Sequence, residues 1–383
     1  MSLRTVHTAT AAVLSAGLVL SGCTAKQSAS EGADSRTRVT VEASDSGCAL
    51  SAAQGPTGPN TFVVTNNGTK VTEFYVYGTG ERVMGEVENI SPGLERTLIV
   101  NLNEPGTYRT ACKPGMIGDG IRSDFVVTGD AVQASTDVKF QQAARDYKRY
   151  VTSQVEALIP ATEAFAAAVR AGDVATAKAM FPTTRTYYER IEPVAESFPD
   201  DLDPRIDLRE ADLEPGQTWT GFHRLEKDLW VSGLQPDSAA IADQLVADVK
   251  ELAEGVTSPD WTIDPTQIAG GAQGLLDEVA VSKITGEEDI FSHTDLWDFN
   301  ANVEGSQTAV ASVRPILDER DRELGTRVDQ GFAEVEALLA TYRTGDGFVS
   351  YDTVTEPQRQ ELSRAIDALS KEVSQVQGAV APQ

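Results

Sequence analysis

Two stretches of the chain have different patterns of apolar and polar residues. Between residues 38 and 128, apolar and polar positions alternate in short runs, for example at 38–43, 61–64 and 72–77. Groups of Gly, Pro and Asn separate these runs. Because alternation places one side of each strand against a core, and breakers at this spacing mark turns, the pattern predicts a β-sandwich.

From about residue 137 the pattern becomes helical. Segments rich in Ala, Glu, Leu and Arg repeat their apolar residues with the helical period at 142–171, 237–254, 265–284 and 319–343. The remaining length accommodates about seven or eight helices, which is typical of a bundle. We therefore expect a multidomain protein, with a β-sandwich over residues 38–130 followed by an all-α helical bundle over 137–383.

The first residues predict export. Arg4 precedes an apolar run at 11–20, which is too short to span a bilayer, and the run ends in Leu20-Ser21-Gly22-Cys23. This order indicates a lipoprotein signal peptide over residues 1–22 and lipidation of Cys23. A simple signal peptide and a buried apolar helix are the alternatives. The polar residues 23–37 predict a flexible tether, so we expect a protein anchored on the outer face of the cell membrane.

The net charge of the chain indicates which kinds of molecule it can bind. The chain has 32 Lys and Arg against 58 Asp and Glu, giving a formal net charge of -26 at pH 7. A polyanion needs a basic surface, so nucleic acid is excluded as a partner. An acidic surface suits cations, although it also serves solubility alone.

One segment of the β-region resembles the cupredoxins. At residues 106–116, a Gly-x-Tyr strand leads to Cys112 and then to Met116, as in the last strand and ligand loop of that family. A blue-copper centre needs two His beside the Cys thiolate. Of the three His in the chain, His7 leaves with the signal peptide, and His223 and His293 lie in the helical region. Blue-copper electron transfer is therefore excluded.

The donors that remain in the β-region leave two interpretations open. Cys48, Glu73, Glu86 and Cys112 are candidate ligands, with carboxylates suited to ferric iron and sulfur suited to copper. A disulfide between Cys48 and Cys112 is the alternative, because it is the usual fate of cysteines in an exported protein. A sulfur in a disulfide has no thiolate to offer a metal.

The helical region contains a second candidate site. His223 and Glu226 are three residues apart, so on a helix they share a face and can give one nitrogen and one carboxylate to a single ion. Di-iron bundles build their sites from such pairs. Without further ligands, a surface pair or a core His bonded to Glu is the simpler interpretation.

Further ligands would come from other helices. Glu189 and Glu192 are also three apart, and Pro193 is expected to kink or end their helix. Asp207 falls in a predicted loop, and Glu156 lies on the first long helix near Pro160. Alternatively, each of these acidic residues could be an ordinary side chain on the solvent-exposed surface.

A standard hydrolase centre is not supported. Inverted zinc peptidases need His-x-x-Glu-His, and here Lys227 follows Glu226, so the second His ligand is missing. The sequence also contains no Gly-x-Ser-x-Gly segment. We therefore expect a binding protein, with a metallopeptidase as the alternative and a purely structural lipoprotein as a third class.

Taken in order, these features resemble a known family. The lipobox, the cupredoxin-like region and the segments 188–193, 221–226 and 282–298 together resemble the EfeO family, the extracytoplasmic components of EfeUOB ferrous-iron transporters. The shorter Gly-x-His-x-x-Glu pattern is shared by imelysin-like proteins in general. The lipobox departs from the many relatives that are soluble, and it favours a surface anchor.

The resemblance implies a cupredoxin-like domain, an imelysin-like bundle and a role in iron uptake. It implies iron as the bound metal, with copper or zinc as further ions, and two partners: a membrane iron permease and a haem-peroxidase-like subunit. It places one metal on His223 and Glu226, with Glu189, Glu192 and Asp207 nearby. It also implies a second site around Cys48, Glu73, Glu86 and Cys112.

Overall fold

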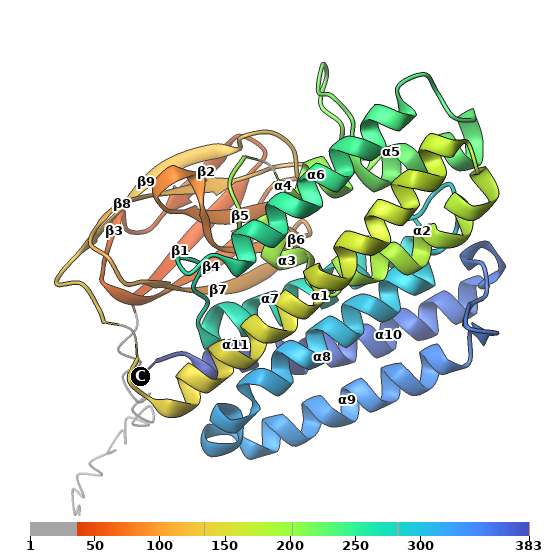
Figure 1. The fold of residues 1–383 in the computed structure, drawn as a ribbon. Helices are drawn as coiled ribbons and strands as arrows, with labels where there is room; N and C mark the ends of the chain where they lie inside the picture. The colour runs from red at the N-terminus through yellow and green to blue at the C-terminus, as the bar shows by residue number, and fades with distance from the viewer. Residues whose placement is uncertain (1–36, 134, 201, 282, 383) are drawn as a thin grey trace, which may run out of the picture. The chain divides into compact units, whose positions relative to one another are not determined.

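The computed structural model describes residues 37–133, 135–200, 202–281 and 283–382 (Figure 1). The predicted signal peptide, Cys23 and nearly all of the predicted tether lie outside the described residues. Within the described ranges, every helix is either too short or too polar to cross a membrane.

The first part is a sandwich of two sheets, with strand orders β2-β1-β4-β7 and β3-β9-β8-β5-β6. The strands are β1 (Thr37–Ser44), β2 (Gly47–Leu50), β3 (Gln54–Pro56), β4 (Gly58–Asn66), β5 (Thr72–Tyr77), β6 (Val83–Ile90), β7 (Glu95–Leu102), β8 (Gly106–Cys112) and β9 (Ile121–Thr128). The runs predicted at 38–43, 61–64 and 72–77 lie in β1, β4 and β5. The predicted β-sandwich is confirmed.

Alternation along β1 builds the core of the sandwich. Val39 and Val41 are buried, whereas the residues between and beside them are exposed. Between the two sheets, Phe62 packs against Phe74 and Phe125, with ring centroids 5.3 and 5.1 Å apart. Burial of such large rings contributes most of the apolar stabilisation of a small sandwich.

Cys48 and Cys112 form a disulfide that joins the two sheets. Cys48 lies on β2 opposite Ala43, and Cys112 ends β8 opposite Phe74. Because β2 and β8 belong to different sheets, the packing of the two sheets brings the Cα atoms to 5.6 Å. That separation is in the range that a disulfide requires. The structure therefore contradicts the interpretation of Cys48 and Cys112 as thiolate ligands, because both sulfurs are already bonded.

Removing this disulfide is expected to destabilise the sandwich. The bond closes a loop with a sequence separation of 64 residues, so Cys48→Ala/Cys112→Ala should lower the free energy of unfolding by about 2–4 kcal/mol. Guanidinium unfolding followed by circular dichroism measures the difference, and reduced wild-type protein should unfold at the same midpoint as the variant. A variant that unfolds at the same guanidinium concentration as the oxidised wild type would contradict the prediction.

The second part consists of helices, with a small hairpin of β10 (Arg343–Thr344) and β11 (Gly347–Phe348) as an exception to the all-α expectation. The longer helices are α1 (Val138–Ala171), α2 (Val174–Glu189), α6 (Ser238–Thr257), α7 (Pro265–Val281), α8 (Asp295–Arg320), α9 (Arg322–Ala340) and α10 (Glu356–Val373). The shorter ones are α3 (Glu192–Glu196), α4 (Leu202–Asp207), α5 (Gly221–Lys227) and α11 (Val376–Val380).

The ends of these helices follow local capping rules. The Asp137 carboxylate accepts a hydrogen bond from the backbone of Lys139 at the start of α1, and Gly172 ends that helix in the left-handed conformation. The prediction of one helix over residues 319–343 is wrong at its N-terminal end, because α8 ends at Arg320. The Asp321 carboxylate caps the next helix, α9, by accepting a hydrogen bond from the backbone N–H of Leu324.

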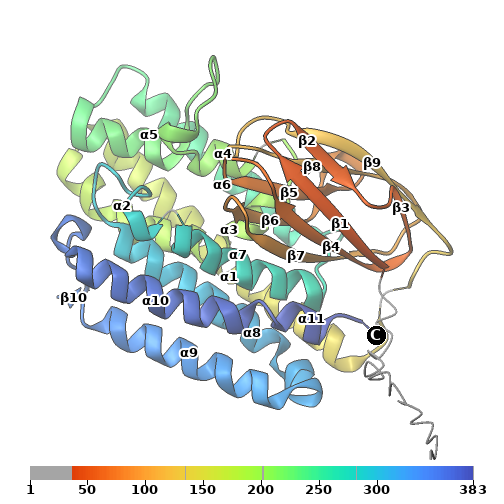
Figure 2. The ribbon, with the colours of Figure 1, turned by 180° about the vertical axis from the view of Figure 1, so that it is seen from behind.

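The sandwich and the helices pack on one another through β6, β7 and α7 (Figure 2). The Asn101 amide donates to Asp264 Oδ2 at 3.0 Å, and Gln377 Oε1 accepts from the backbone N–H of Ile99 at 3.1 Å. These polar contacts fix the position of the β6 edge of the sandwich above α3, α4 and α7, where carboxylates from both parts meet.

Candidate metal centre

A glycine allows α5 to approach α4. Gly221 has φ +85°, and a Cβ atom there would lie 2.1 Å from the carbonyl oxygen of Ile206. Only glycine tolerates this approach. As a result, the first turn of α5 carries His223 against Asp207, which is the last residue of α4 and does not lie in the predicted loop.

One side of the His223 ring is held by Glu226. His223 is 1% exposed, and its Nδ1 lies 3.2 Å from Glu226 Oε2, as expected for a pair on one helical face. The other oxygen, Glu226 Oε1, accepts hydrogen bonds from the backbone N–H groups of Phe291 at 3.1 Å and Ser292 at 2.7 Å. Glu226 is therefore fixed in place, and it fixes the orientation of the imidazole.

The other side of the ring is open to a ligand. His223 Nε2 lies 3.6 Å from Asp207 Oδ1 and 3.5 Å from Glu288 Oε1. It is buried, and no group in the described part of the chain forms a hydrogen bond with it. Burial and Arg185 lower the pKa of His223, but Asp207 and Glu226 outweigh them, so this pKa lies well above its ordinary value. Two carboxylates that face a buried imidazole nitrogen suit its proton or a bound cation.

Two overlapping groups of donor atoms surround His223. One consists of Asp207, His223 and Glu288, and the other of His223, Glu226 and Asp289, with the donor atoms of each group within 4.8 Å of one another. All of these residues are buried. A nitrogen and two carboxylate oxygens make a donor set for a first-row transition metal.

The pKa shifts distinguish the two groups. Burial raises the pKa of Asp207, but Arg185 and His223 outweigh it, so this pKa lies below its ordinary value. At Glu288, burial is likewise outweighed by Lys283 and His223, and the pKa is well below its ordinary value. Burial and Glu226 instead raise the pKa of Asp289 to about 8. Asp207 and Glu288, which face Nε2, are therefore ionised at neutral pH, whereas Asp289 is mostly protonated.

The sequence did not single out Glu288 and Asp289 as ligands. Both lie between η4 (Lys283–Thr285) and α8, in a segment without helical or strand periodicity. The stretch 282–298 contributes to the family resemblance, and its run of consecutive acidic residues is the sequence feature that could have indicated metal ligands. No spacing rule relates such a segment to His223, because the chain between them forms helices.

The predicted ligands Glu189 and Glu192 lie near the centre but contact a lysine. Glu189 ends α2, and Glu192 begins α3. The helix that Pro193 was expected to kink or end stops before it, and Pro193 lies in the first turn of α3. The carboxylates of Glu189 and Glu192 accept from Lys283 Nζ at 2.5 and 3.1 Å. The two residues therefore lie on either side of a helix break rather than on one helical face.

A buried arginine lies among the same carboxylates. Arg185 is fully buried and pairs with Glu288 at 3.1 Å and with Asp298 at 3.3 Å. It also contacts Glu189, Asp207 and Asp289. The buried carboxylates of the centre outnumber its two fully buried cations, Arg185 and Lys283; these carboxylates are Glu189, Glu192, Asp207, Glu226, Glu288, Asp289 and Asp298. Protons or a bound cation must balance the excess.

Glu156 is not part of the centre. It is exposed on α1, whose buried positions in that turn are Val155 and Leu158. The prediction of Glu156 as a ligand is therefore wrong, because the rotation of α1 in the bundle points this position towards solvent.

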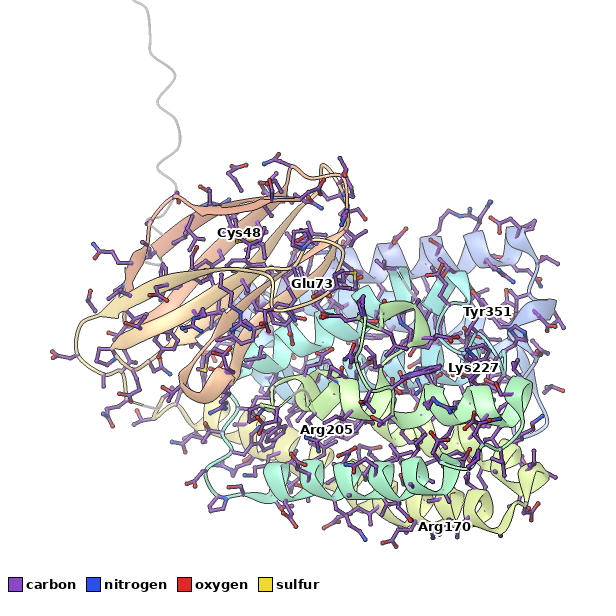
Figure 3. The ribbon with its side chains drawn as sticks, turned by 90° about the horizontal axis from the view of Figure 1, so that it is seen from above. Cys48, Glu73, Arg170, Arg205, Lys227 and Tyr351 are labelled. Atoms are coloured by element: carbon purple, nitrogen blue, oxygen red, sulfur yellow. A yellow bond between two sulfur atoms is a disulfide. The ribbon has the colours of Figure 1, made fainter. Side chains whose placement is uncertain are left out.

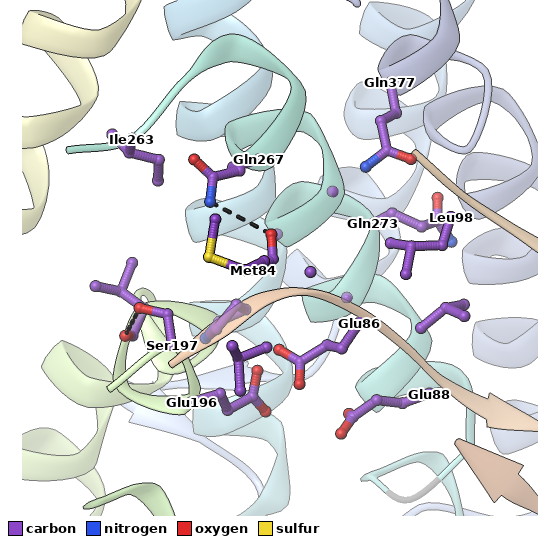
Figure 4. Close-up of a pocket in the computed structure, with 18 of the residues that line it drawn as sticks. Met84, Glu86, Glu88, Leu98, Glu196, Ser197, Ile263, Gln267, Gln273 and Gln377 are labelled. Atoms are coloured by element: carbon purple, nitrogen blue, oxygen red, sulfur yellow. Dashed lines mark hydrogen bonds between the residues drawn. The ribbon is translucent and has the colours of Figure 1, made fainter. Parts of the chain in front are cut away.

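Glu73 and Glu86 belong to a second group of carboxylates, away from the disulfide. Glu73 lies on β5 and Glu86 on β6, where Glu86 is opposite Tyr75. Burial raises the pKa of Glu73 and of Glu86 to about 7 each. Figure 3 locates Glu73 and Cys48 in the sandwich, and Figure 4 shows Glu86 near Glu88 and Glu196.

A cleft between the sandwich and the helices contains part of this group. Its volume is about 710 Å³, and its lining includes Glu86 and Glu88 from β6, Glu196 from α3 and Asp203 from α4. Burial raises the pKa of Asp203 to about 7 as well. Since Asp203 and Asp207 are one turn apart on α4, this short helix connects the cleft with the His223 centre.

Two family models match the two parts of this chain. The model of the Imelysin family matches residues 143–376, and the model of the cupredoxin-like domain matches residues 11–127. The fold and the buried His223 centre thus define the class: imelysin proteins that carry a cupredoxin-like domain in front of the bundle.

The relatives define the family within that class. "Iron uptake system component EfeO" of Escherichia coli (strain K12) is 40% identical over 348 residues, which cover 89% of this chain and 91% of the relative. The protein of the same name from Shigella flexneri has the same identity and coverage. The chain belongs to the EfeO family.

One solved structure is similar to a smaller part of the chain. Dithionite-reduced auracyanin from Roseiflexus castenholzii is 15% identical to this chain, covers 24% of it and 98% of its own length, and has a TM-score of 0.21. That score is too low to support an argument.

Proposed function

We propose that this chain is an extracytoplasmic iron-binding protein that takes up one iron ion at His223 Nε2, together with Asp207 and Glu288, and passes it to a membrane iron permease. The observation that carries this proposal is the buried Nε2, which has no hydrogen bond from the described residues and faces two carboxylates. The relatives named as iron uptake components support iron as the cargo.

The donor set favours iron on chemical grounds. Carboxylate oxygens are hard donors that suit ferric ions, and an imidazole nitrogen suits iron, copper and zinc alike. The described residues of this centre contribute no sulfur, the donor that would select copper. In this proposal Glu226 orients His223 through Nδ1, as outer-shell carboxylates do for metal-bound imidazoles.

The proposal includes a second cation position at the cleft, where Glu86, Glu196 and Asp203 gather negative charge from both parts of the chain. Glu73 interacts electrostatically with Glu86 without lining the cleft, and the field of Lys113 reaches both Glu73 and Glu86. In this proposal the position lies on the route of a cation towards α4. Copper or zinc would compete with iron there, and Cys48 and Cys112 do not take part.

The cellular setting completes the proposal. The lipobox and Cys23 favour a lipid anchor on the outer face of the membrane, which would keep the protein close to its permease. The family resemblance adds a haem-peroxidase-like subunit of the same uptake system as a partner. The acidic composition argues against a nucleic-acid partner.

An imelysin-type metallopeptidase is the alternative function. A peptidase needs a metal-bound water that a peptide can reach. His223 is 1% exposed, and Asp207 and Glu288 are also buried, so the geometry favours binding over hydrolysis.

The test measures metal stoichiometry in the lipid-free mature protein. Equilibrium dialysis against Fe(II), Fe(III), Cu(II) and Zn(II), followed by elemental analysis, should show stoichiometric iron. The variant His223→Ala/Glu288→Gln should lose one equivalent. Equal iron content in the wild type and this variant would refute the proposal, and hydrolysis of peptides that stops with a chelator would favour the peptidase.

A further inference from the structure

Lys283 occupies a position that resembles that of a bound cation. Its side chain is fully buried, and its ammonium lies 2.5 Å from Glu189 Oε2, 3.1 Å from Glu192 Oε2 and 3.7 Å from Glu288 Oε1. Three carboxylates from three different segments of the chain therefore converge on one point. Lysine is rarely found fully buried unless it is paired, and here it is paired with more acids than one charge neutralises.

A buried amide holds the same carboxylates in place. Asn302 on α8 is fully buried, and its Nδ2 donates to the backbone carbonyl oxygen of Glu189 at 2.8 Å, to Glu189 Oε2 at 3.2 Å and to Glu192 Oε2 at 3.4 Å. These bonds keep the two carboxylates on either side of the Lys283 ammonium.

Glu288 connects this point with the His223 site. Its Oε1 atom lies 3.5 Å from His223 Nε2 and 3.7 Å from Lys283 Nζ. One carboxylate therefore faces two neighbouring cation positions. Helical bundles with two metal ions use the same elements, namely carboxylates from several helices and a histidine close by.

We propose that Lys283 takes the place of a second metal ion in a two-position carboxylate centre, and so limits the bundle to a single transition-metal ion. This inference rests on the proposed function for the first position, at His223 Nε2. The ammonium lies between Glu189 and Glu192 and supplies one positive charge to them, and this charge repels a second cation. Without it, Glu189, Glu192 and Glu288 form an oxygen-rich site for a divalent cation.

The test removes the ammonium and counts metal ions. Lys283→Met and Lys283→Gln are dialysed against Zn(II) and Co(II), and the bound metal is measured by elemental analysis. Each variant should bind one equivalent more than the wild type, and adding Glu192→Gln should remove that equivalent. Lys148→Met is the matched control, because the Lys148 ammonium donates to the carbonyl oxygens of Ser258 and Trp261 and should yield no extra metal.

Thermal unfolding provides a second readout. Without metal, both Lys283 variants should unfold at a lower temperature than the wild type, since Glu189 and Glu192 lose their counterion, and Zn(II) should restore most of the difference. Unchanged stoichiometry in both folded variants overturns the inference. Failure to fold even with Zn(II) overturns it as well, because metal should replace the ammonium.

The outcomes separate this inference from the proposed function. The wild type could bind no metal at His223 while Lys283→Met binds one ion that Glu192→Gln removes. That result would support the second metal position beside Glu192 and refute the proposed function. If the wild type binds one ion and the Lys283 variants also bind only one, the result supports the proposed function and refutes the proposed role of Lys283.

Discussion

Replacing His223 by alanine is expected to lower the affinity for iron more than about 100-fold, beyond the loss that accompanies removal of an outer-shell partner. His223 supplies the nitrogen donor of the centre, and its Nε2 is the buried atom that lacks a hydrogen bond within the described residues. Competition with a chelator of known affinity measures the change. The variant should stay folded by circular dichroism, since the ring leaves a pocket of polar groups rather than an apolar cavity.

The order of effects among the neighbours tests the geometry. Asp207→Asn and Glu288→Gln should approach the loss of His223→Ala, because both carboxylates face Nε2. Glu226→Gln should cost less, about 10–100-fold, because Glu226 acts by orienting the ring. His293→Asn is the control: asparagine tolerates the positive φ of 58° at this position. A loss at Glu226 as large as at His223 would instead make Glu226 a ligand.

Replacing Arg185 by methionine is expected to lower the free energy of unfolding of the metal-free protein by about 3–5 kcal/mol, the usual cost of removing one partner from a buried ion pair. Methionine keeps much of the side-chain volume, so the loss reports charge rather than packing. The change leaves Asp207, Glu288 and Asp298 buried without the cation that they share. Urea unfolding in the presence of a chelator measures the difference.

A surface arginine provides the control for Arg185. Arg170 pairs with Asp243 where both side chains are exposed, so Arg170→Met should change the free energy of unfolding by less than about 1 kcal/mol. Added Zn(II) should recover part of the loss in Arg185→Met, because a bound cation can replace the missing charge. A loss in Arg185→Met no larger than in Arg170→Met would show that the carboxylates take up protons instead.

Both predictions follow from the same imbalance of charge. The centre buries more carboxylates than cations, and burial shifts part of them towards the protonated form, as at Asp289. Arg185, Lys283 and His223 hold Asp207 and Glu288 ionised. Under the proposed function, these two ionised carboxylates are the ligands that receive the metal ion.

The sequence by itself determined the local features of this protein. Alternation at 38–43 matches a strand with one buried face, because a period of two residues places successive side chains on opposite faces of a sheet. The run at 72–77 also forms a strand, but every residue in it is buried, which its alternating pattern does not indicate. The spacing of His223 and Glu226 placed them on one face of α5, and Pro193 lies in the first turn of α3, where its missing N–H costs no hydrogen bond. These are short-range effects, decided within a turn or two of chain.

The tertiary structure decided which of these groups meet. The rotation of α1 turned Glu156 outwards, the packing of the two sheets joined Cys48 to Cys112, and the loop before α8 brought Glu288 to His223. The Glu189 and Glu192 carboxylates met Lys283, which no periodicity relates to them. Each of these contacts joins residues far apart in sequence, and their geometry depends on how whole elements pack, which residue spacing does not specify.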